Sequence, residues 1–199
     1  MPIPIRQIRA VYDEKTIRIY QAYNDAIADS VLESGTFVSP PFKLERMTWI
    51  KPSFLWMMYR SGWGKKDNGQ NRILAIDISR EGFEWALKHS LLSNQAKNYE
   101  NKEEWLKIKK ATPVRIQWDP ERDLHLQPLD HRAIQIGLTN EAVNLYVNEW
   151  VQKITEVTGF ASQLYELIEN NQLNKVESLL PKEIEYCLDL KLKERIESQ

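Results

Sequence analysis

The sequence predicts an α+β fold with a mixed, mostly antiparallel sheet, packed helices and a helical C-terminal tail. Short runs rich in β-branched and aromatic residues, such as residues 16–23, are typical of strands. Apolar residues at helical spacing follow several of these runs and are bounded by capping residues. The order is strands, helices, a strand, a helix, then strands and a helical tail, and this order favours the α+β class.

The first part of the chain predicts two strands and a capped helix. Residues 5–13 and 16–23 have the composition and alternation of strands. Asn24 is a suitable N-cap for the helix that follows, and Gly35 is a suitable residue to end it. Residues 37–42 contain two adjacent prolines, so we expect an extended loop there.

The next segment predicts a buried helix followed by a central strand. We expect Lys51 and Pro52 to begin the helix, because proline suits the first helical position, and Gly62 to end it. The residues between them are apolar nearly all round, which is typical of a buried helix. Residues 72–79 are almost continuously apolar and predict a central strand, and an amphipathic helix is expected over residues 81–92.

The second half predicts two strands and more helix. Residues 113–118 and 131–138 read as strands, with a turn at residues 119–123 between them. Residues 94–111 are polar and rich in lysine, so we expect a surface insertion with a helical piece. A long helix is predicted over residues 141–158, and two shorter helical segments complete the chain.

The length of 199 residues favours one domain with an appended tail, and we assign residues 1–158 to a single α+β domain and residues 159–199 to a helical extension. The single Cys187 excludes a disulfide framework within the chain, which fits a reducing compartment, so we expect a cytoplasmic protein. The sequence shows neither a signal peptide nor a membrane-spanning run, so no membrane partner is expected. The oligomeric state is left open.

Charge is separated along a chain whose net charge is −1. Residues 46–80 carry seven basic and two acidic side chains, whereas residues 139–199 carry six basic and eleven acidic ones. A basic middle in a neutral protein suggests a local anion site. Two solvated faces of opposite sign are the alternative explanation.

The stretch RMTWIKPSFLWMMYRSGWG, residues 46–64, is where we expect this site. Phosphates and carboxylates bind at helix N-termini, so Lys51 and Arg60 would hold phosphate, while Trp49 or Trp56 would stack on a base. The alternative for the tryptophans is core packing. The alternative for Arg60 is a structural ion pair with a carboxylate, such as Asp77 or Asp119.

Polar side chains within the predicted strands could complete such a cleft or could simply be solvated. They are Arg6, Arg9, Arg18, Tyr20, Gln21, Arg132 and Gln135. The three histidines have none of the spacings of metal sites, so no metal is expected. The crowded carboxylates Asp119, Glu121 and Asp123 could share a proton in acid–base work, although Asp-Pro is also a common turn starter.

The strings RQIRAVYD, IYQAYN, RMTWIKPSFLWMMYRSGWG, QWDPERDL and IQIGL resemble a family of bacterial and fungal proteins described only as a domain of unknown function, DUF4291. The resemblance covers residues 5–158. It implies one compact domain and brings no established activity with it.

A weaker resemblance is to ADP-ribosyltransferase-type folds, which bind NAD in a cleft between two small sheets. It rests on a strand that ends in YQAYN, a helix that ends in glycine and an apolar loop after it. It implies a split sheet and NAD as cofactor. The positions that could fill its motif roles are Arg9 or Gln21 for the first-strand residue, Ser53 or Tyr59 for the middle one, and Glu121 or Gln135 for the late one.

These patterns together predict a nucleotide- or phosphate-handling protein whose partner is a small-molecule nucleotide or an RNA end. The expected ligand-binding residues are Arg9, Tyr20, Gln21, Trp49, Lys51, Ser53, Trp56, Arg60 and Arg132, and the candidate catalytic residues are Glu121 and Gln135. If the protein is an enzyme, an NAD-dependent transferase is the class that the resemblance implies. The alternatives are a non-catalytic module for RNA or phosphorylated ligands, and an interaction protein with a docking tail.

Overall fold

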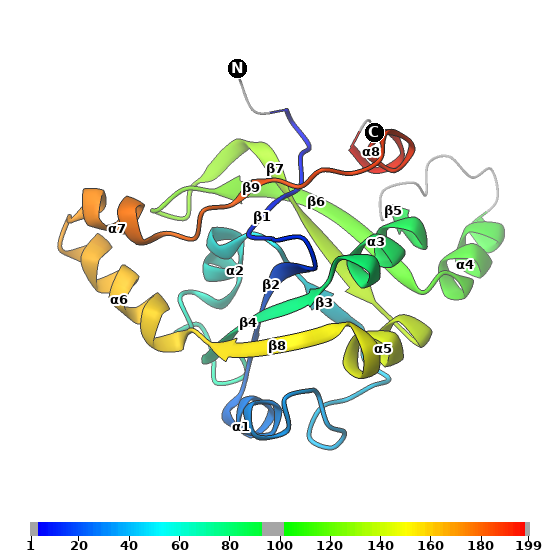
Figure 1. Ribbon diagram of the computed structural model, residues 1–199, viewed down its shortest axis with the longest axis horizontal. Helices are drawn as coiled ribbons and strands as arrows, with labels where there is room; N and C mark the ends of the chain where they lie inside the picture. Colours follow the sequence, from blue (N-terminus) through cyan, green and yellow to red (C-terminus); the bar gives the residue numbers. More distant parts are fainter. Residues whose placement is uncertain (1–3, 93–101, 198–199) are drawn as a thin grey trace.

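The computed structural model describes residues 4–92 and 102–197 and contains two larger sheets with helices around them (Figure 1). The strands are β1 (Arg9–Ala10), β2 (Thr16–Tyr23), β3 (Thr48–Ile50), β4 (Arg72–Ser79), β5 (Ser90–Leu92), β6 (Val114–Arg122), β7 (Pro128–Leu138), β8 (Val151–Glu156) and β9 (Ile184–Glu185). The helices are α1 (Asp25–Ser34), α2 (Phe54–Ser61), α3 (Arg80–Lys88), α4 (Lys102–Ala111), α5 (Glu141–Leu145), α6 (Thr158–Glu169), α7 (Leu173–Leu179) and α8 (Leu190–Glu197), with a π-helical turn at Tyr146–Trp150. The predicted α+β class is confirmed.

The sheets are mostly antiparallel, as the sequence predicts. One has the strand order β2-β4-β8 and the other the order β3-β7-β6-β5, in which only the β5–β6 pair is parallel. β1 and β9 form a separate two-stranded pair. The two larger sheets touch where the backbone N–H of Tyr20 donates to the carbonyl of Lys51, at 2.7 Å. This contact joins the edge of β2 to the end of β3.

Local signals placed several boundaries correctly. Asn24 caps α1 by accepting from the N–H of Ile27 at 3.0 Å, and Gly35 ends that helix in the left-handed conformation. Gly62 ends α2 in the same way. β2 and β4 have the predicted bounds, and β4 is the central strand of its sheet.

The start of α2 was predicted two to three residues too early. Ser53 is the N-cap and accepts from the N–H of Trp56 at 3.1 Å, so the helix begins at Phe54. Lys51 instead continues the extended path of β3, because its carbonyl is engaged by β2. The lysine therefore lies beside the sheet, and the helix starts after it.

Three further predictions are wrong for reasons of tertiary pairing. The helix predicted over residues 141–158 ends early, because residues 151–156 pair with β4 as strand β8. The helix predicted over residues 81–92 ends at Lys88 and is followed by β5. The turn predicted at residues 119–123 lies later, because β6 continues to Arg122 through a bulge after Pro120.

The N-terminal strand is shorter than predicted, since within residues 5–13 only Arg9–Ala10 is named as a strand. The lysine-rich segment contains the expected helical piece as α4, whereas residues 93–101 lie outside the described residues. α4 lies at one end of the long axis of the molecule, and α6 and α7 lie at the other (Figure 1).

The acidic C-terminal segment is integrated into the core. β9 pairs with β1, and Tyr186 is 1% exposed, with its hydroxyl accepting from Arg80 and donating to Glu84, each at 2.9 Å. α8 is anchored by the indole N–H of Trp118, which donates to a carbonyl near the end of the helix. In the described part of the chain, no helix has the length and apolar character needed to cross a membrane.

Candidate functional site

A cavity of about 920 Å³ is lined by residues of both larger sheets. One side is formed by the end of β2 and by helix α2, and the other by strands β3, β6 and β7. Loops before β3 and before β4 contribute to the rim. The bridge between Tyr20 and Lys51 lies where these walls meet, so the fold brings residues from distant parts of the sequence to one hollow.

Basic side chains outnumber acidic ones around this cavity. The basic residues are Lys43, Arg46, Lys51, Arg60 and Arg122, and the acidic ones are Asp67 and Asp119. Asp67 accepts hydrogen bonds from the backbone of Gly69 and the side chain of Gln70, both at 2.8 Å. Both acids therefore lie on the cavity wall and accept hydrogen bonds from neutral groups.

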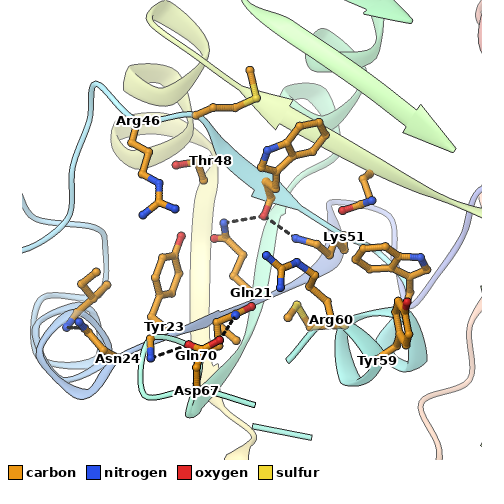
Figure 2. Close-up of a pocket in the computed structure, with 18 of the residues that line it drawn as sticks. Gln21, Tyr23, Asn24, Arg46, Thr48, Lys51, Tyr59, Arg60, Asp67 and Gln70 are labelled. Atoms are coloured by element: carbon orange, nitrogen blue, oxygen red, sulfur yellow. Dashed lines mark hydrogen bonds between the residues drawn. The ribbon is translucent and has the colours of Figure 1, made fainter. Parts of the chain in front are cut away.

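Asp119 is held by two amides. It accepts from Gln117 at 3.0 Å and also from Gln135 on the neighbouring strand β7. Within residues 4–92 and 102–197, neither Arg46 nor Arg60 has a carboxylate within ion-pair distance. Both arginines are exposed at the cavity, and their charges are available to a ligand (Figure 2).

Lys51 is the buried member of this group, with 6% of its surface exposed. Its Nζ donates to the carbonyl of Trp49 at 3.2 Å and lies 5.8 Å from the centroid of the Trp56 ring. Burial and, to a lesser extent, the charge of Arg60 lower the pKa of this amine to about 7, whereas the charge of Asp119 opposes the change. Close to neutral pH the amine is therefore present in both protonation states.

Gln21 is a buried residue of the cavity wall beside Lys51. Its Nε2 donates to the carbonyl of Trp49 at 3.0 Å, and its Oε1 accepts from the hydroxyl of Tyr146 at 2.7 Å. The side chain is 3% exposed, so both ends of the amide are satisfied inside the protein. Figure 2 shows Gln21 and Lys51 converging on the same carbonyl, with the guanidinium of Arg60 close by.

Aromatic side chains form much of the remaining surface. Trp49 lies on Gly137 of β7, where an added Cβ would be 3.1 Å from the indole ring. The indole N–H of Trp56 is buried and has no hydrogen-bond partner among the described residues. Tyr59 is 41% exposed, and the guanidinium of Arg122 lies 3.6 Å from the centroid of its ring.

Figure 2 shows the hydroxyl of Tyr23 pointing toward the guanidinium of Arg46 on the opposite side of the cavity from Lys51. Burial raises the pKa of Tyr23, and the charge of Arg46 opposes the shift. The phenol is therefore neutral at physiological pH and can donate or accept a hydrogen bond. Tyr23 and Arg46 therefore form a second polar region of the cavity, on the other side from Lys51 and Arg60.

Five predicted ligand or catalytic residues lie outside the large cavity. Arg9, Ser53, Glu121 and Arg132 line a separate hollow of about 10 Å³, a space for roughly one water molecule. Tyr20 lies on neither surface, because its ring is buried against Phe54 with a centroid separation of 5.4 Å. The structure therefore groups Gln21, Trp49, Lys51, Trp56, Arg60 and Gln135 in the large cavity and leaves the other candidates outside it.

The expectation of a free helix N-terminus is wrong for α2. The N–H of Phe54 donates to Glu183 at 2.7 Å, so a carboxylate of the C-terminal segment occupies that end. Burial raises the pKa of Glu183 to about 8, and the nearby Glu121 adds to the shift. Burial also raises the pKa of Glu121, although Ser53 and the backbone of Arg122 donate to its carboxylate.

The bulge in β6 explains why Glu121 is not in the cavity. In a regular strand, residues 117, 119 and 121 would share a face. The register shift between Pro120 and Arg122 breaks this alternation, so that Gln117, Asp119 and Arg122 line the large cavity. Sequence reasoning therefore missed Arg122 as a lining residue, because nothing in the sequence marks the bulge.

Two other outcomes concern the predicted alternatives. Asp77 pairs with Arg18 at 2.8 Å, so it is not the partner of Arg60. Arg46 was not among the predicted ligand-binding residues, although it belongs to the basic stretch that predicted the site. The concentration of basic residues in that stretch was the signal that could have identified it. In the described ranges, no group of three or more histidine, cysteine, aspartate or glutamate side chains is arranged to hold a metal ion.

Comparison with known families gives one match. The model of the family described as Domain of unknown function (DUF4291) covers residues 7–186. The match extends beyond the predicted domain boundary at residue 158 and includes β9 and Glu183. No curated protein matches the chain.

Proposed function

The chain belongs to the DUF4291 family, and we propose that it binds a nucleotide or another organic phosphate in the large cavity. The observation that carries the proposal is the pair of arginines, Arg46 and Arg60, which face the cavity without a carboxylate partner among the described residues. Guanidinium groups suit phosphate because their planar donors can form two parallel hydrogen bonds.

The size of the cavity supports a ligand larger than a simple ion. About 920 Å³ lies within the usual range of small-molecule sites. The phosphate would bind near Lys51 and Arg60, where charge is concentrated and water is partly excluded. Arg46, across the cavity, would contact a second phosphate or another anionic group of the same ligand (Figure 2).

The aromatic walls support a ligand that carries a ring. Trp49 and Tyr59 offer apolar surface on which a base can stack, whereas Trp56 is 5% exposed and mostly buried in the wall. Such stacking is sequence-tolerant because every base has a π-face. Gln135 has its amide engaged with Asp119, so it presents a fixed edge to the ligand.

NAD fits this set of groups as a candidate ligand, since it carries two phosphates and two rings. Arg46, Lys51 and Arg60 would hold its phosphates, and Trp49 and Tyr59 would contact its rings. A transferase would need a carboxylate beside the ribose to stabilise positive charge as the glycosidic bond breaks. Asp119 is the carboxylate on that wall, with Gln135 orienting it, whereas Glu121 lies outside the cavity.

A second candidate is binding of an RNA end or a phosphorylated ligand without turnover. It uses the same cations and aromatic residues. The position of Glu121 favours it, because the carboxylate expected to act in catalysis lines the small hollow. Incubation of the protein with NAD followed by mass spectrometry separates the two candidates, since only a transferase or glycohydrolase releases nicotinamide.

Isothermal titration calorimetry with AMP, ADP-ribose, NAD and a 5′-phosphorylated oligoribonucleotide tests the proposal. We expect Arg46→Gln and Arg60→Gln to weaken binding by about 10- to 100-fold each, because a hydrogen bond to a charged group contributes about 1.5–3 kcal/mol. Lys191→Gln is the matched control, since Lys191 is exposed on α8 and does not line the cavity. The proposal fails if none of these ligands binds, or if both arginine variants bind as the wild type does.

A further inference from the structure

We infer that Lys51 is a neutral amine in the ligand-free cavity at mildly alkaline pH and accepts a proton when an organic phosphate binds. Ligand binding would then be coupled to the uptake of a proton, and Lys51 would be the residue that makes affinity depend on pH. This inference rests on the proposed function, because it concerns the same cavity. It adds a role for Lys51 and a pH dependence of the affinity, which ligand binding alone does not require.

The backbone holds Lys51 where it is 6% exposed and has little contact with solvent. The carbonyl of Lys51 accepts from the N–H of Tyr20 at 2.7 Å, which fixes the residue between the two sheets. The amine donates to the carbonyl of Trp49, and that carbonyl also accepts from Gln21. Lysine has three donors when charged, so this single bond leaves the ammonium poorly solvated.

Four other charged groups of the cavity come from three elements, and two of them, Arg60 and Asp119, act on the pKa of Lys51. Arg60 is on α2, Asp119 and Arg122 are on β6, and Arg46 is on the loop before β3. In the described parts of the chain, no carboxylate lies within ion-pair distance of Lys51. The negative charge of Asp119 raises the pKa of Lys51, but the Asp119 carboxylate already accepts hydrogen bonds from two side-chain amides.

The other acidic and titratable groups of the cavity do not compensate the lysine. Asp67 belongs to the loop before β4 and is engaged by that loop's own donors. Tyr23 on β2 is a neutral phenol, because burial raises its pKa. Desolvation and the charge of Arg60 therefore dominate, which agrees with the lowered pKa of about 7.

A bound phosphate reverses both effects. Its negative charge offsets the repulsion from Arg60, and its oxygen atoms accept the hydrogens that Lys51 cannot donate elsewhere. The pKa of the amine must rise, and by linkage the proton and the phosphate then bind cooperatively. At pH 8 about nine-tenths of the amines are neutral before binding if the pKa is about 7, so uptake approaches one proton.

Calorimetry in buffers of different ionisation enthalpy measures this uptake. The probes are ADP-ribose and AMP, whose phosphates do not titrate near pH 8, so a proton taken up there belongs to the protein. We expect nearly one proton per ligand at pH 8 for both probes and much less at pH 6 for ADP-ribose, whose phosphates do not titrate at that pH, unlike the monoester of AMP. We also expect wild-type affinity to fall by up to about tenfold per pH unit above pH 8, as the neutral amine must first gain its proton.

Substitutions locate the proton. Lys51→Met should bind more weakly and take up no proton, and Lys51→Arg should bind without uptake, because arginine stays charged at these pH values. Lys191→Met is the control and should keep the wild-type uptake. Binding without uptake in the wild type, or the same uptake in Lys51→Met, overturns the inference while leaving the proposed function in place. Absence of binding in the wild type counts against the proposed function instead.

A measurement without any ligand provides an independent check. The 13Cε resonances of the lysines, followed by NMR from pH 5 to pH 11, report each amine directly, and Lys51→Arg assigns the resonance. We expect one lysine to titrate two or more pH units below the exposed ones. If every lysine titrates above pH 9.5, the inference is wrong whether or not a ligand has been found.

Discussion

Glu183→Gln is the substitution that best tests how the C-terminal segment is held against the cavity wall. The carboxylate of Glu183 accepts from the N–H of Phe54 at the start of α2, and this helix carries Trp56, Tyr59 and Arg60. Glutamine keeps an oxygen acceptor for that bond and removes the titratable group. The substitution therefore separates the hydrogen bond from the cost of holding a charge there.

The expected effect follows from the pKa of Glu183, which rises from 4.5 to about 8 on folding. Between these two values the native protein holds a proton that the unfolded chain has released, so the free energy of unfolding falls as pH rises. The difference of about 3.5 units corresponds to an upper limit of about 5 kcal/mol. Glu183 is only partly buried, and solvent screening reduces the expected effect to about 2 kcal/mol.

Urea denaturation of both proteins at pH 5, 7 and 9 measures this difference. We expect the two stabilities to be similar at pH 5 and Glu183→Gln to be more stable by about 2 kcal/mol at pH 9, or about 4–8 °C in Tm. Other titrating groups are common to both proteins and cancel in the comparison. Parallel stability curves for the two proteins across this pH range would refute the reasoning.

Glu185→Gln is the matched control in the same segment. Glu185 pairs with Lys193 at 2.7 Å, and the hydrogen bond from that lysine lowers the pKa of the carboxylate. A carboxylate with a lowered folded pKa contributes stability above its unfolded pKa and loses it as pH falls. Glu185→Gln should therefore be slightly destabilising at pH 7 and pH 9, opposite in sign to the effect expected for Glu183→Gln.

Glycine substitutions give three further predictions. Gly82→Ala should destabilise the fold by about 1–3 kcal/mol or more in urea denaturation, because the new Cβ would lie 2.3 Å from the Trp150 ring. Gly159→Ala is its control, since nothing lies within 4 Å of that position in α6, and should be neutral or stabilising by up to about 1 kcal/mol. Gly137→Ala should displace the Trp49 ring, 3.1 Å away, and weaken nucleotide binding in calorimetry; unchanged affinity would count against a role for Trp49.

The elements that sequence predicted well are those determined by local chemistry. Asn24 and Gly35 bound α1 because a side-chain acceptor and a left-handed residue are needed at those ends. The strand at residues 72–79 is recognisable because both its faces are covered, which requires apolar residues at nearly every position. Such requirements act within a few residues of the chain, so they are visible without knowledge of the fold.

The elements that were predicted wrongly depend on distant partners. Val151 and Ile154 are three residues apart and fit a helical pattern, yet residues 151–156 form a strand because the edge of β4 is available for pairing. The start of α2 was misplaced for a related reason, since Lys51 is held in an extended conformation by Tyr20 of β2. Local preference at these positions is weak compared with the hydrogen bonds gained across the sheet.

The candidate site also combines features that depend on local sequence with features that depend on distant partners. Trp49, Lys51, Trp56 and Arg60 lie in one short stretch, and the strand–helix turn through Ser53 brings them to the same cavity. Glu121 depended on strand alternation, which the bulge after Pro120 interrupts. The engagement of the helix N-terminus depended on a segment more than a hundred residues away in the sequence, and no pattern near α2 indicates it.

Occupation of the α2 N-terminus by Glu183 also determines what kind of anion site the cavity can be. In glycine-rich phosphate loops the ligand is held by backbone N–H groups and the helix dipole, which do not titrate. Here the N–H of Phe54 is already engaged, so a ligand in the cavity must be held by side chains. Two of these, Arg46 and Arg60, keep their charge at all physiological pH values, and Lys51 does not. We therefore expect a site of this construction to bind phosphate throughout the physiological pH range and to change its affinity with the protonation of a single buried amine.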